Sequence, residues 1–363
     1  MTTRTTSNGS TSSPTSSVAD LDTLRHALRG WLGSGPIDSP TGAYFAWIEE
    51  GTGRAAFEYP EITGYALTYL MGRPEPSREE LSRAARAADW LVDRLDRGDR
   101  SARDGWDDGA HYTFDLGMIA TGLLLFGDRC ESERHLRMGL DLAAGFRDEI
   151  EATGALAAIP AGSPATARQG WSTEGEAHML KLTQCLLLAD RQELPGAMDA
   201  AVALVANGSV FQRDDGSFRT QPDAELTMLH PHVYALEGLW MYSQATGDPI
   251  ALARVEAGLE WAWRTQLESG GFPRLIAPAS QAVEQGDVTT QTIRIAAALA
   301  ARPEGFETAL RRLADYARPA PGGEALVYQP EADATHHNAW VTMFGAQALD
   351  WALDGAGNWE TLV

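Results

Sequence analysis

Two kinds of apolar segment alternate along this chain six times. The first kind begins with polar and aromatic residues and continues as an apolar run rich in small residues. Because these runs carry apolar side chains on more than one face, they predict helices that are buried on both sides. Successive starts lie roughly 50 to 60 residues apart, within the range of repeat units. The segments are YPEITGYALTYLMG from Tyr59, HYTFDLGMIATGLLLFG from His111, TEGEAHMLKLTQCLLLAD from Thr173, HPHVYALEGLWMYSQATG from His230, DVTTQTIRIAAALA from Asp287 and HHNAWVTMFGAQALDWAL from His336.

The second kind of segment is amphipathic. Apolar residues recur at i, i+3, i+4 and i+7, with charged residues opposite, which predicts helices on the outside of an assembly. Ser77 and Glu80 form the S-x-x-E pattern of a capping box at the start of one of them. These segments are LDTLRHALRGWL from Leu21, REELSRAARAADWLVDRLDR from Arg78, ERHLRMGLDLAAGFRDEI from Glu133, PGAMDAAVALVAN from Pro195, PIALARVEAGLEWAWRTQLE from Pro249 and EGFETALRRLADYAR from Glu304.

The alternation predicts an all-α fold, an (α/α)6 toroid of six helical hairpins in a single domain over residues 19–363. A closed repeat can exceed the usual domain size because each hairpin buries itself against its neighbours. Residues 1–18 are rich in Ser and Thr and lack an apolar stretch, so we expect a disordered tail and no secretion signal. This favours a cytoplasmic protein. No apolar run approaches the length of a membrane span.

Composition narrows the function classes. The chain has 363 residues, with 29 Lys and Arg against 50 Asp and Glu, and a formal net charge of −21. This charge argues against nucleic acids and anionic membranes as partners. Lys181 is the only lysine, and no phosphate-binding G-x-x-x-x-G-K-[ST] motif contains it, so we expect no organic cofactor. The oligomeric state does not follow from the sequence.

The toroid prediction places the candidate chemistry. All six inner helices begin at the same end of the ring, which we call the mouth, and the long loops gather there. Helix N-termini favour negatively charged groups. Three carboxylates near inner-helix starts are candidates for acid/base catalysis, namely Glu61, Asp108 and Glu174. Asp107 precedes Asp108, and adjacent carboxylates shift each other's pKa, as an acid/base pair requires.

Four of the eight histidines fall in two of these starts, HPHVYALE and HHNAW. Histidine suits proton transfer near neutral pH. His230 and His337 are therefore candidate acid/base residues, and His232 and His336 candidate ligand-binding residues. Glu174 and His178 are four positions apart and share a helix face, so the pair could form half of a metal site. No H-E-x-x-H motif completes such a site, and we predict no metal.

Further polar and aromatic residues at the mouth suit substrate binding. Aromatic faces beside carboxylates and histidines typically line a sugar cleft, but they equally suit a pocket for an apolar or cationic ligand. The guanidinium of Arg274 could bind a carboxylate or phosphate through two hydrogen bonds. The remaining candidate binding residues are Tyr59, Trp106, Asp107, Trp171, Arg274, Asp287, Asn338 and Trp340.

Two stretches carry a resemblance to known proteins. EYPEITGY with the preceding GAYFAW, and the late HHNAWV, resemble segments of bacterial six-hairpin toroid proteins found with polysaccharide and glycoconjugate genes. Those proteins are similar in turn to six-hairpin glycosidases and sugar epimerases. The resemblance implies a toroid that acts on sugars.

A second, weaker resemblance is to the repeats of prenyltransferases and squalene–hopene-type cyclases. WRTQLESGGF from Trp263 and VFQRDDGSF from Val210 resemble their Q-x-x-x-G-x-[FW] segments. The D-x-D-D acid motif of class II terpenoid cyclases is replaced here by D-x-x-D-D, formed by Asp104, Asp107 and Asp108.

Three hypotheses follow. The first is a sugar-active enzyme, a glycoside hydrolase or an epimerase, whose carboxylates serve as acid and base or nucleophile. In an epimerase, His230 and His337 would exchange a proton on opposite faces of the sugar. The second is a terpenoid-type cyclase or isomerase with an aromatic cavity, and the third is a binding scaffold without catalysis. For the sugar enzyme, the acidic mouth favours a neutral or cationic sugar over a polyuronate.

Overall fold

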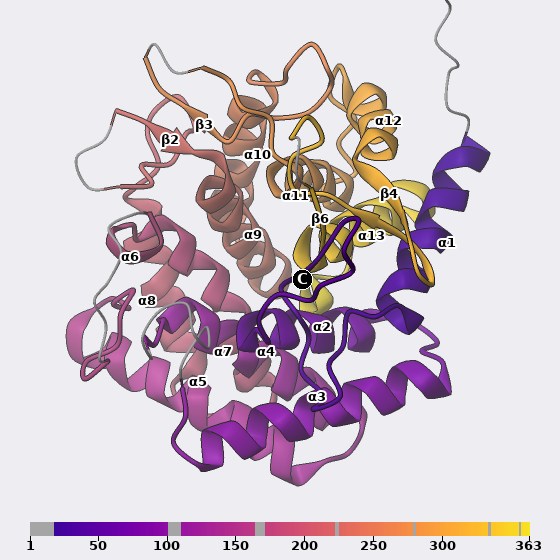
Figure 1. The fold of residues 1–363 in the computed structure, drawn as a ribbon. Helices are drawn as coiled ribbons and strands as arrows, with labels where there is room; N and C mark the ends of the chain where they lie inside the picture. Colours follow the sequence, from indigo (N-terminus) through magenta and orange to yellow (C-terminus); the bar gives the residue numbers. More distant parts are fainter. Residues whose placement is uncertain are drawn as a thin grey trace, which may run out of the picture.

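The computed structural model describes residues 18–100, 110–163, 171–221, 225–278, 281–332, 335–355 and 357–363. Over these residues the helices form a closed ring of two layers (Figure 1), which confirms the predicted (α/α)6 toroid. The outer layer consists of α1 (Val18–Ser34), α3 (Arg78–Asp96), α5 (Glu133–Thr153), α8 (Ala197–Ser209), α10 (Pro249–Trp263) and α12 (Phe306–Tyr316). The predicted N-terminal tail lies outside the described residues, apart from Val18.

The inner layer follows the apolar segments. It consists of α2 (Pro60–Gly72), α4 (Thr113–Arg129), η1 (Ala177–Leu182) continued by α7 (Thr183–Arg191), α9 (Leu229–Thr246), α11 (Gly286–Ala298) and α13 (Ala339–Asp354). Almost every residue of α2 and α11 and most residues of α9 are buried, as expected for helices enclosed by their neighbours. The third inner helix differs from the expectation, because its first six residues form a 3-10 turn. Two short elements, α6 (Trp171–Glu174) and η2 (Trp359–Thr361), complete the helices.

The outer helices show the predicted amphipathic burial. In α3 the buried side is formed largely by Ala84, Ala87, Ala88 and Leu91. The capping box before this helix is present, because the Glu80 N–H donates to Ser77 Oγ at 3.2 Å and the Ser77 N–H donates to Glu80 Oε2 at 2.7 Å. Among the described helices none is long and apolar enough to cross a membrane.

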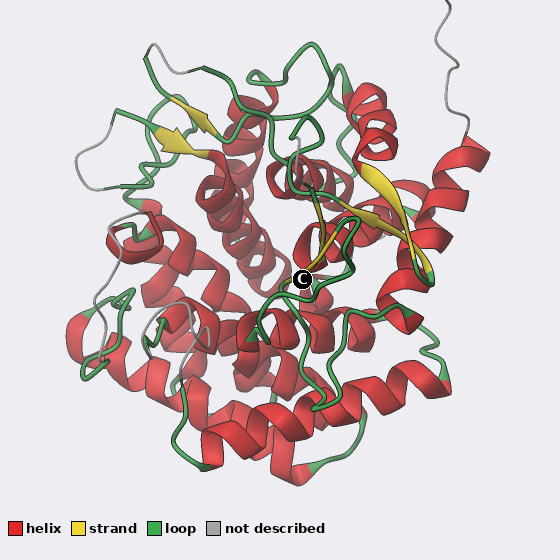
Figure 2. Cartoon of the chain, in the orientation of Figure 1, coloured by secondary structure: helices red, strands yellow, loops and turns green. Residues whose placement is uncertain are grey.

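Three short antiparallel strand pairs lie in the loops between helices (Figure 2). β1 (Trp47–Glu49) pairs with β6 (His336–Asn338), β2 (Thr227–Met228) with β3 (Leu275–Ile276), and β4 (Ala317–Ala320) with β5 (Gly323–Leu326). The first pair matters most for the fold, because it joins the first hairpin to the last and so closes the ring at the mouth.

The centre of the ring is filled. The last residues of the chain lie there, at the C mark in Figure 1. The Gln347 side-chain amide donates to the main-chain oxygen of Thr361 at 2.7 Å, and Gln184 donates to that of Leu362 at 2.9 Å. Lys181 donates to the main-chain oxygen of Val363 at 3.1 Å. Leu362 and Val363 are fully buried.

A buried cluster of charges surrounds this filled centre. Lys181 Nζ lies 2.9 Å from Glu237 Oε2, and Arg294 pairs with the other carboxylate oxygen of Glu237. All three side chains are fully buried. Burial raises the pKa of Glu237, but the charges of Arg294 and Lys181 outweigh burial and leave that pKa below its ordinary value. The carboxylate thus stays ionised inside the ring, as a compensated buried charge.

The inner helices approach one another through glycines. A Cβ on Gly238 of α9 would lie 2.0 Å from the main-chain oxygen of Leu180 in η1, and one on Gly64 of α2 would lie 2.6 Å from that of Met118 in α4. Main-chain atoms cannot move aside as the end of a flexible side chain can. Any residue other than glycine at these positions would therefore force one of the helices to shift.

We therefore expect Gly238→Ala to lower the melting temperature, because one methyl group overpacks the interface by about 1–3 kcal/mol. The matched control is Gly145→Ala on the exposed side of α5, where a Cβ would meet nothing within 4 Å. Alanine has the better helix propensity there, so this control is expected to leave the melting temperature unchanged or raise it. Differential scanning calorimetry of both variants checks the prediction, and equal shifts would contradict it.

Candidate active site

A cavity of about 330 Å³ opens at the mouth of the ring, above the filled centre. Each inner helix contributes its second or third residue to the lining, because the inner helices all start at this end and their first turns face the axis. These lining residues are Glu61 on α2, Asp115 on α4, His178 on η1, His230 on α9, Asp287 on α11 and Trp340 on α13. The repeat thus places acidic, imidazole and aromatic groups around one small space.

Two of the carboxylates stand on neighbouring helices. Glu61 and Asp115 belong to α2 and α4, which pack against each other through Gly64 and Gly122. Both carboxylates line the cavity and are buried. Adjacent helices that meet through glycine bring their starts close together, so the lining has an acidic side formed by this pair.

His230 and Asp287 occupy another part of the lining. His230 Nδ1 donates to Gln291 Oε1 at 2.6 Å and lies 3.4 Å from Asp287 Oδ2. Both oxygens lie on the Nδ1 side of the ring and orient the imidazole in the lining. Asp287 is held in turn, since the Val288 N–H donates to its Oδ1 at 2.8 Å.

Aromatic side chains form the rest of the lining. Trp340 stands edge-to-face with Trp47 and with Tyr328, at ring-centroid distances of 6.4 Å and 5.8 Å. Phe57 packs against Trp47 at 5.4 Å, and Tyr59 packs against Phe57 at 5.3 Å. The edge-to-face arrangement is the favourable one for aromatic pairs and makes this side of the cavity a packed surface.

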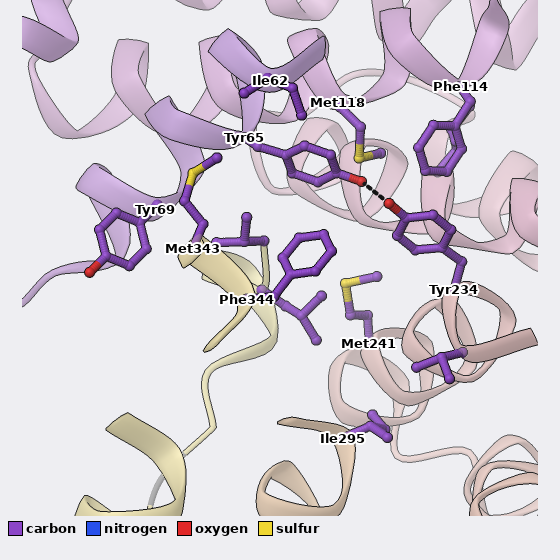
Figure 3. Packing of buried hydrophobic residues seen from close by; sticks show 14 of the residues in the cluster. Ile62, Tyr65, Tyr69, Phe114, Met118, Tyr234, Met241, Ile295, Met343 and Phe344 are labelled. Carbon is purple, nitrogen blue, oxygen red and sulfur yellow. Dashed lines mark hydrogen bonds between the residues drawn. The ribbon is translucent and has the colours of Figure 1, made fainter. Parts of the chain in front are cut away.

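Tyr65 and Tyr234 form the base of the cavity. Figure 3 shows their hydroxyls pointing toward each other from α2 and α9, with Tyr65 donating to Tyr234 at 2.9 Å. Burial raises the pKa of both phenols well above the ordinary value. The ammonium of Lys181 lies 5.9 Å from the centre of the Tyr234 ring, so the cavity base rests on the buried charge cluster.

His178 is the second imidazole of the lining. It packs against Phe114 at a ring distance of 5.5 Å and is almost completely buried. Burial, with a smaller contribution from His230, lowers the pKa of His178 to about 3. This imidazole is therefore neutral near pH 7.

Five of the residues expected from the sequence line the cavity, namely Tyr59, Glu61, His230, Asp287 and Trp340. Trp106, Asp107 and Asp108 lie outside the described residues, as does the side chain of Trp171. The other six are absent from the lining.

Among those six, Glu174 is exposed at the end of α6, at a separate shallow depression that also contains Arg219. Arg274 is likewise exposed. His232 lies in the core, where its Nδ1 accepts the Phe218 N–H at 3.2 Å and its Nε2 donates to the Gly258 oxygen at 3.1 Å. The first bond ties α9 to the loop before it, and the second ties α9 to α10.

The histidine pair in β6 is divided by strand alternation, because neighbouring side chains of a strand point to opposite faces. His336 packs against Trp47 at 4.8 Å, behind the aromatic side of the cavity. His337 turns to the outer layer and meets the edge of Trp31 at 6.4 Å. Asn338 is the N-cap of α13, with its Oδ1 accepting the Val341 N–H at 3.0 Å.

The candidate list from the sequence missed several lining residues, among them Asp115, His178, Trp47 and Tyr328. Asp115 and His178 could have been found from their position in the repeat, because each is the second or third residue of an inner helix. No such signal marks Trp47 and Tyr328, which come from loops. Within the described residues, no group of three His, Cys, Asp or Glu side chains is arranged to hold a metal ion.

Solved structures of unsaturated glucuronyl hydrolases are similar to this chain over nearly its whole length. The enzyme from Bacillus sp. GL1, described as responsible for the degradation of glycosaminoglycan, has a TM-score of 0.68 at 14% identity, covering 93% of this chain and 97% of that one. One specific for heparin gives 0.66 at 12% identity, covering 93% and 96%. A variant from Streptococcus agalactiae complexed with dGlcA-GalNAc6S gives 0.65 at 12%, covering 94% of both chains.

At such low identity the likeness shows the fold, which is the (α/α)6 toroid. No family model matches the sequence, and neither does any curated protein. The first resemblance noted in the sequence, to toroid proteins of polysaccharide metabolism, is thus confirmed at the level of architecture.

The depressed pKa of His178 has a consequence for stability. An unfolded histidine titrates near pH 6.5, whereas the folded one stays neutral down to about pH 3. Below pH 6.5 the unfolded state therefore binds a proton that the folded state does not, and stability falls on acidification. We expect His178→Asn to show a smaller drop in melting temperature between pH 7 and pH 5 than the parent protein.

The control for that experiment is His26→Asn, which removes an exposed histidine of α1. This variant should show the same drop in melting temperature between pH 7 and pH 5 as the parent protein. If His178→Asn also shows the parent's drop, the lowered pKa of His178 does not contribute to the pH dependence of stability.

Proposed function

We propose that this chain is a glycoside hydrolase that acts on a small sugar unit in the cavity at the mouth. The observation that carries the proposal is the pair of buried carboxylates, Glu61 and Asp115, on adjacent inner helices in an aromatic-lined cavity. Its volume of about 330 Å³ is at the low end for ligand pockets and suits a short sugar rather than a long chain held along its length. The names of the structurally similar proteins, which are hydrolases of glucuronyl groups, support the same class.

Hydrolysis of a glycosidic bond needs two carboxyl groups with different tasks. One must be protonated to act as the general acid on the leaving oxygen, and the other must be ionised to act as base or nucleophile. In this proposal Glu61 and Asp115 take these two tasks, because they stand on adjacent inner helices and line the same cavity. Their separation then sets whether the anomeric configuration is retained or inverted.

The rest of the lining suits the transition state of this reaction. Positive charge develops on the sugar ring as the bond breaks, and fixed negative groups and the electron-rich faces of aromatic rings stabilise it. Asp287 adds a third carboxylate to the lining. The described lining residues include no lysine or arginine that would oppose this charge.

The alternatives are less well supported. A terpenoid cyclase needs a deep pocket with few polar groups, whereas five ionisable side chains from the inner-helix starts line this cavity. An epimerase with His230 and His337 on opposite faces of the sugar would need both near the substrate, but His337 packs against Trp31.

The proposal predicts that Glu61→Gln and Asp115→Asn each lower the hydrolysis rate of a responsive aryl glycoside by about 10²–10⁴-fold, because each removes one proton-transfer or nucleophilic group. Melting temperatures would verify that both variants fold. Steady-state kinetics with a panel of aryl glycosides provides the measurement.

The matched control is Glu133→Gln, which alters an exposed acid in the first turn of an outer helix. It should keep full activity. A fully active Glu61→Gln or Asp115→Asn variant, or a folded parent protein that hydrolyses no glycoside of a broad panel, would overturn the proposal.

A further inference from the structure

Asp287 is almost hidden within the cavity lining. Its side chain is 2% exposed, whereas that of His230, the neighbouring lining residue on α9, is 13% exposed. Tyr328 lines the cavity from the loop after β5 and is half-buried. The imidazole and the phenol therefore present more surface to a ligand than the carboxylate does.

Protein groups approach both oxygens of the Asp287 carboxylate. The Val288 N–H donates to Oδ1 at 2.8 Å, and the Gln285 side-chain amide donates to Oδ2 at 3.1 Å. His230 Nδ1 lies 3.4 Å from the same Oδ2. The carboxylate thus joins its own helix, α11, to the start of α9.

Tyr328 belongs to the same cluster. The Gln285 amide also donates to the Tyr328 hydroxyl, so a single side chain links the phenol to the carboxylate. Burial and then the charge of Asp287 raise the pKa of Tyr328 well above its ordinary value, and a hydrogen bond between the two adds to the rise. A carboxylate has about four acceptor sites, and four groups of the protein surround this one. Little of its capacity remains for a ligand.

The loop before α11 is anchored in the outer layer. Glu284 Oε1 accepts hydrogen bonds from Arg312 Nε at 2.7 Å and from the Tyr316 hydroxyl at 2.5 Å, both on α12. The next residue, Gln285, donates its main-chain N–H to the oxygen of Phe272 at 3.1 Å. The amide that holds the carboxylate therefore extends from a fixed main chain. Support of this kind keeps the side chains of a site within a narrow range of positions.

We propose that Asp287 is a positioning residue of the cavity, whose carboxylate holds the rings of His230 and Tyr328 in place and leaves contact with the sugar to those rings. This inference rests on the proposed function and deepens it. Gln285 completes the arrangement, because its amide spans Asp287 and Tyr328 while it is absent from the described lining.

The alternative role for Asp287 is direct binding of the sugar by its carboxylate. Direct binding requires the carboxylate at position 287 itself. Positioning requires only that the hydrogen bonds to the rings be made, so a carboxylate on the neighbouring Gln285 position can make part of them. The two roles therefore differ in what an exchange of amide and carboxylate would do.

Nuclear magnetic resonance of the intact protein tests the positioning role without a ligand. Isotope-labelled histidine and tyrosine report the two rings, and the variants His230→Asn and Tyr328→Phe assign their signals. We expect Asp287→Asn to shift both signals, because the introduced amide brings a donor to the place where Gln285 and Tyr328 need an acceptor.

The matched control is Asp350→Asn. It removes a carboxylate of the inner helix α13 that pairs with Arg29 and is absent from the described lining. This variant should shift neither signal. Melting temperatures verify that each variant folds.

The double variant Gln285→Glu/Asp287→Asn separates the two roles. It exchanges amide and carboxylate within the pair, so one donor still faces one acceptor and Tyr328 keeps an acidic partner. We expect Asp287→Asn alone to lower kcat/KM for a responsive aryl glycoside about 10–100-fold, as loss of a group that orients a functional side chain usually does. The double variant should restore the Tyr328 signal and recover at least about threefold in kcat/KM, because the two positions are coupled.

The outcomes are distinct. An unshifted Tyr328 or His230 signal in a folded Asp287→Asn variant, or hydrolysis that this variant leaves unaffected, would overturn the inference. A double variant that fails to restore the Tyr328 signal, or that restores it without a gain in kcat/KM, would overturn it too. Shifted signals with no hydrolysis of any glycoside by the parent protein would support the positioning role and overturn the proposed function.

The double variant also decides the case in which Asp287→Asn does not fold. Compared with the parent protein, it should then keep the Tyr328 signal in place and shift that of His230, which has lost its carboxylate. A shifted Tyr328 signal or an unshifted His230 signal would contradict the positioning role.

Discussion

The ionised Glu237 in the middle of the ring is the interaction on which the other features depend. A carboxylate with no access to water is tolerated only when cations compensate it. Lys181 on η1 and Arg294 on α11 do so from the two inner helices that flank α9, which carries Glu237. The only lysine of the chain is used here. Lys181 also binds the main-chain oxygen of Val363, so the same cluster fixes the segment that fills the ring. Loss of one partner would leave a buried charge without compensation.

The cavity at the mouth follows from this filled centre. The C-terminal residues and the Glu237 cluster fill the ring below the cavity. The hydrogen-bonded Tyr65 and Tyr234 lie above them and form the base of the cavity. Close contact of the inner helices through glycines such as Gly64 then holds their starts around a small space. Because every inner helix points the same way, side chains from six separate parts of the sequence meet there. A rigid scaffold with a few polar groups converging on an apolar cavity is the usual form of a binding site.

The sequence was a good guide to the fold and an uneven one to the site. The helix alternation and the Ser77–Glu80 capping box are local patterns, and the structure reproduces them. Glu61 and His230 were identified because a polar residue at the start of an apolar helix is conspicuous. His232 and His337 were equally conspicuous, but the core and the outer layer use them instead. A polar residue at a helix start can serve a ligand or the main chain, and only its neighbours in space decide between these roles.

The sequence by itself determined the number of hairpins, the direction of the inner helices and the acidic character of the mouth, because these depend on local periodicity and composition. The tertiary structure decided which residues face the cavity. Strand pairing of β1 with β6 sends His336 toward the aromatic side and His337 away from it. Helix contact brings Glu61 next to the helix of Asp115, and loop packing adds Trp47 and Tyr328 to the lining. Such contacts join residues far apart in the chain, so no local pattern encodes them.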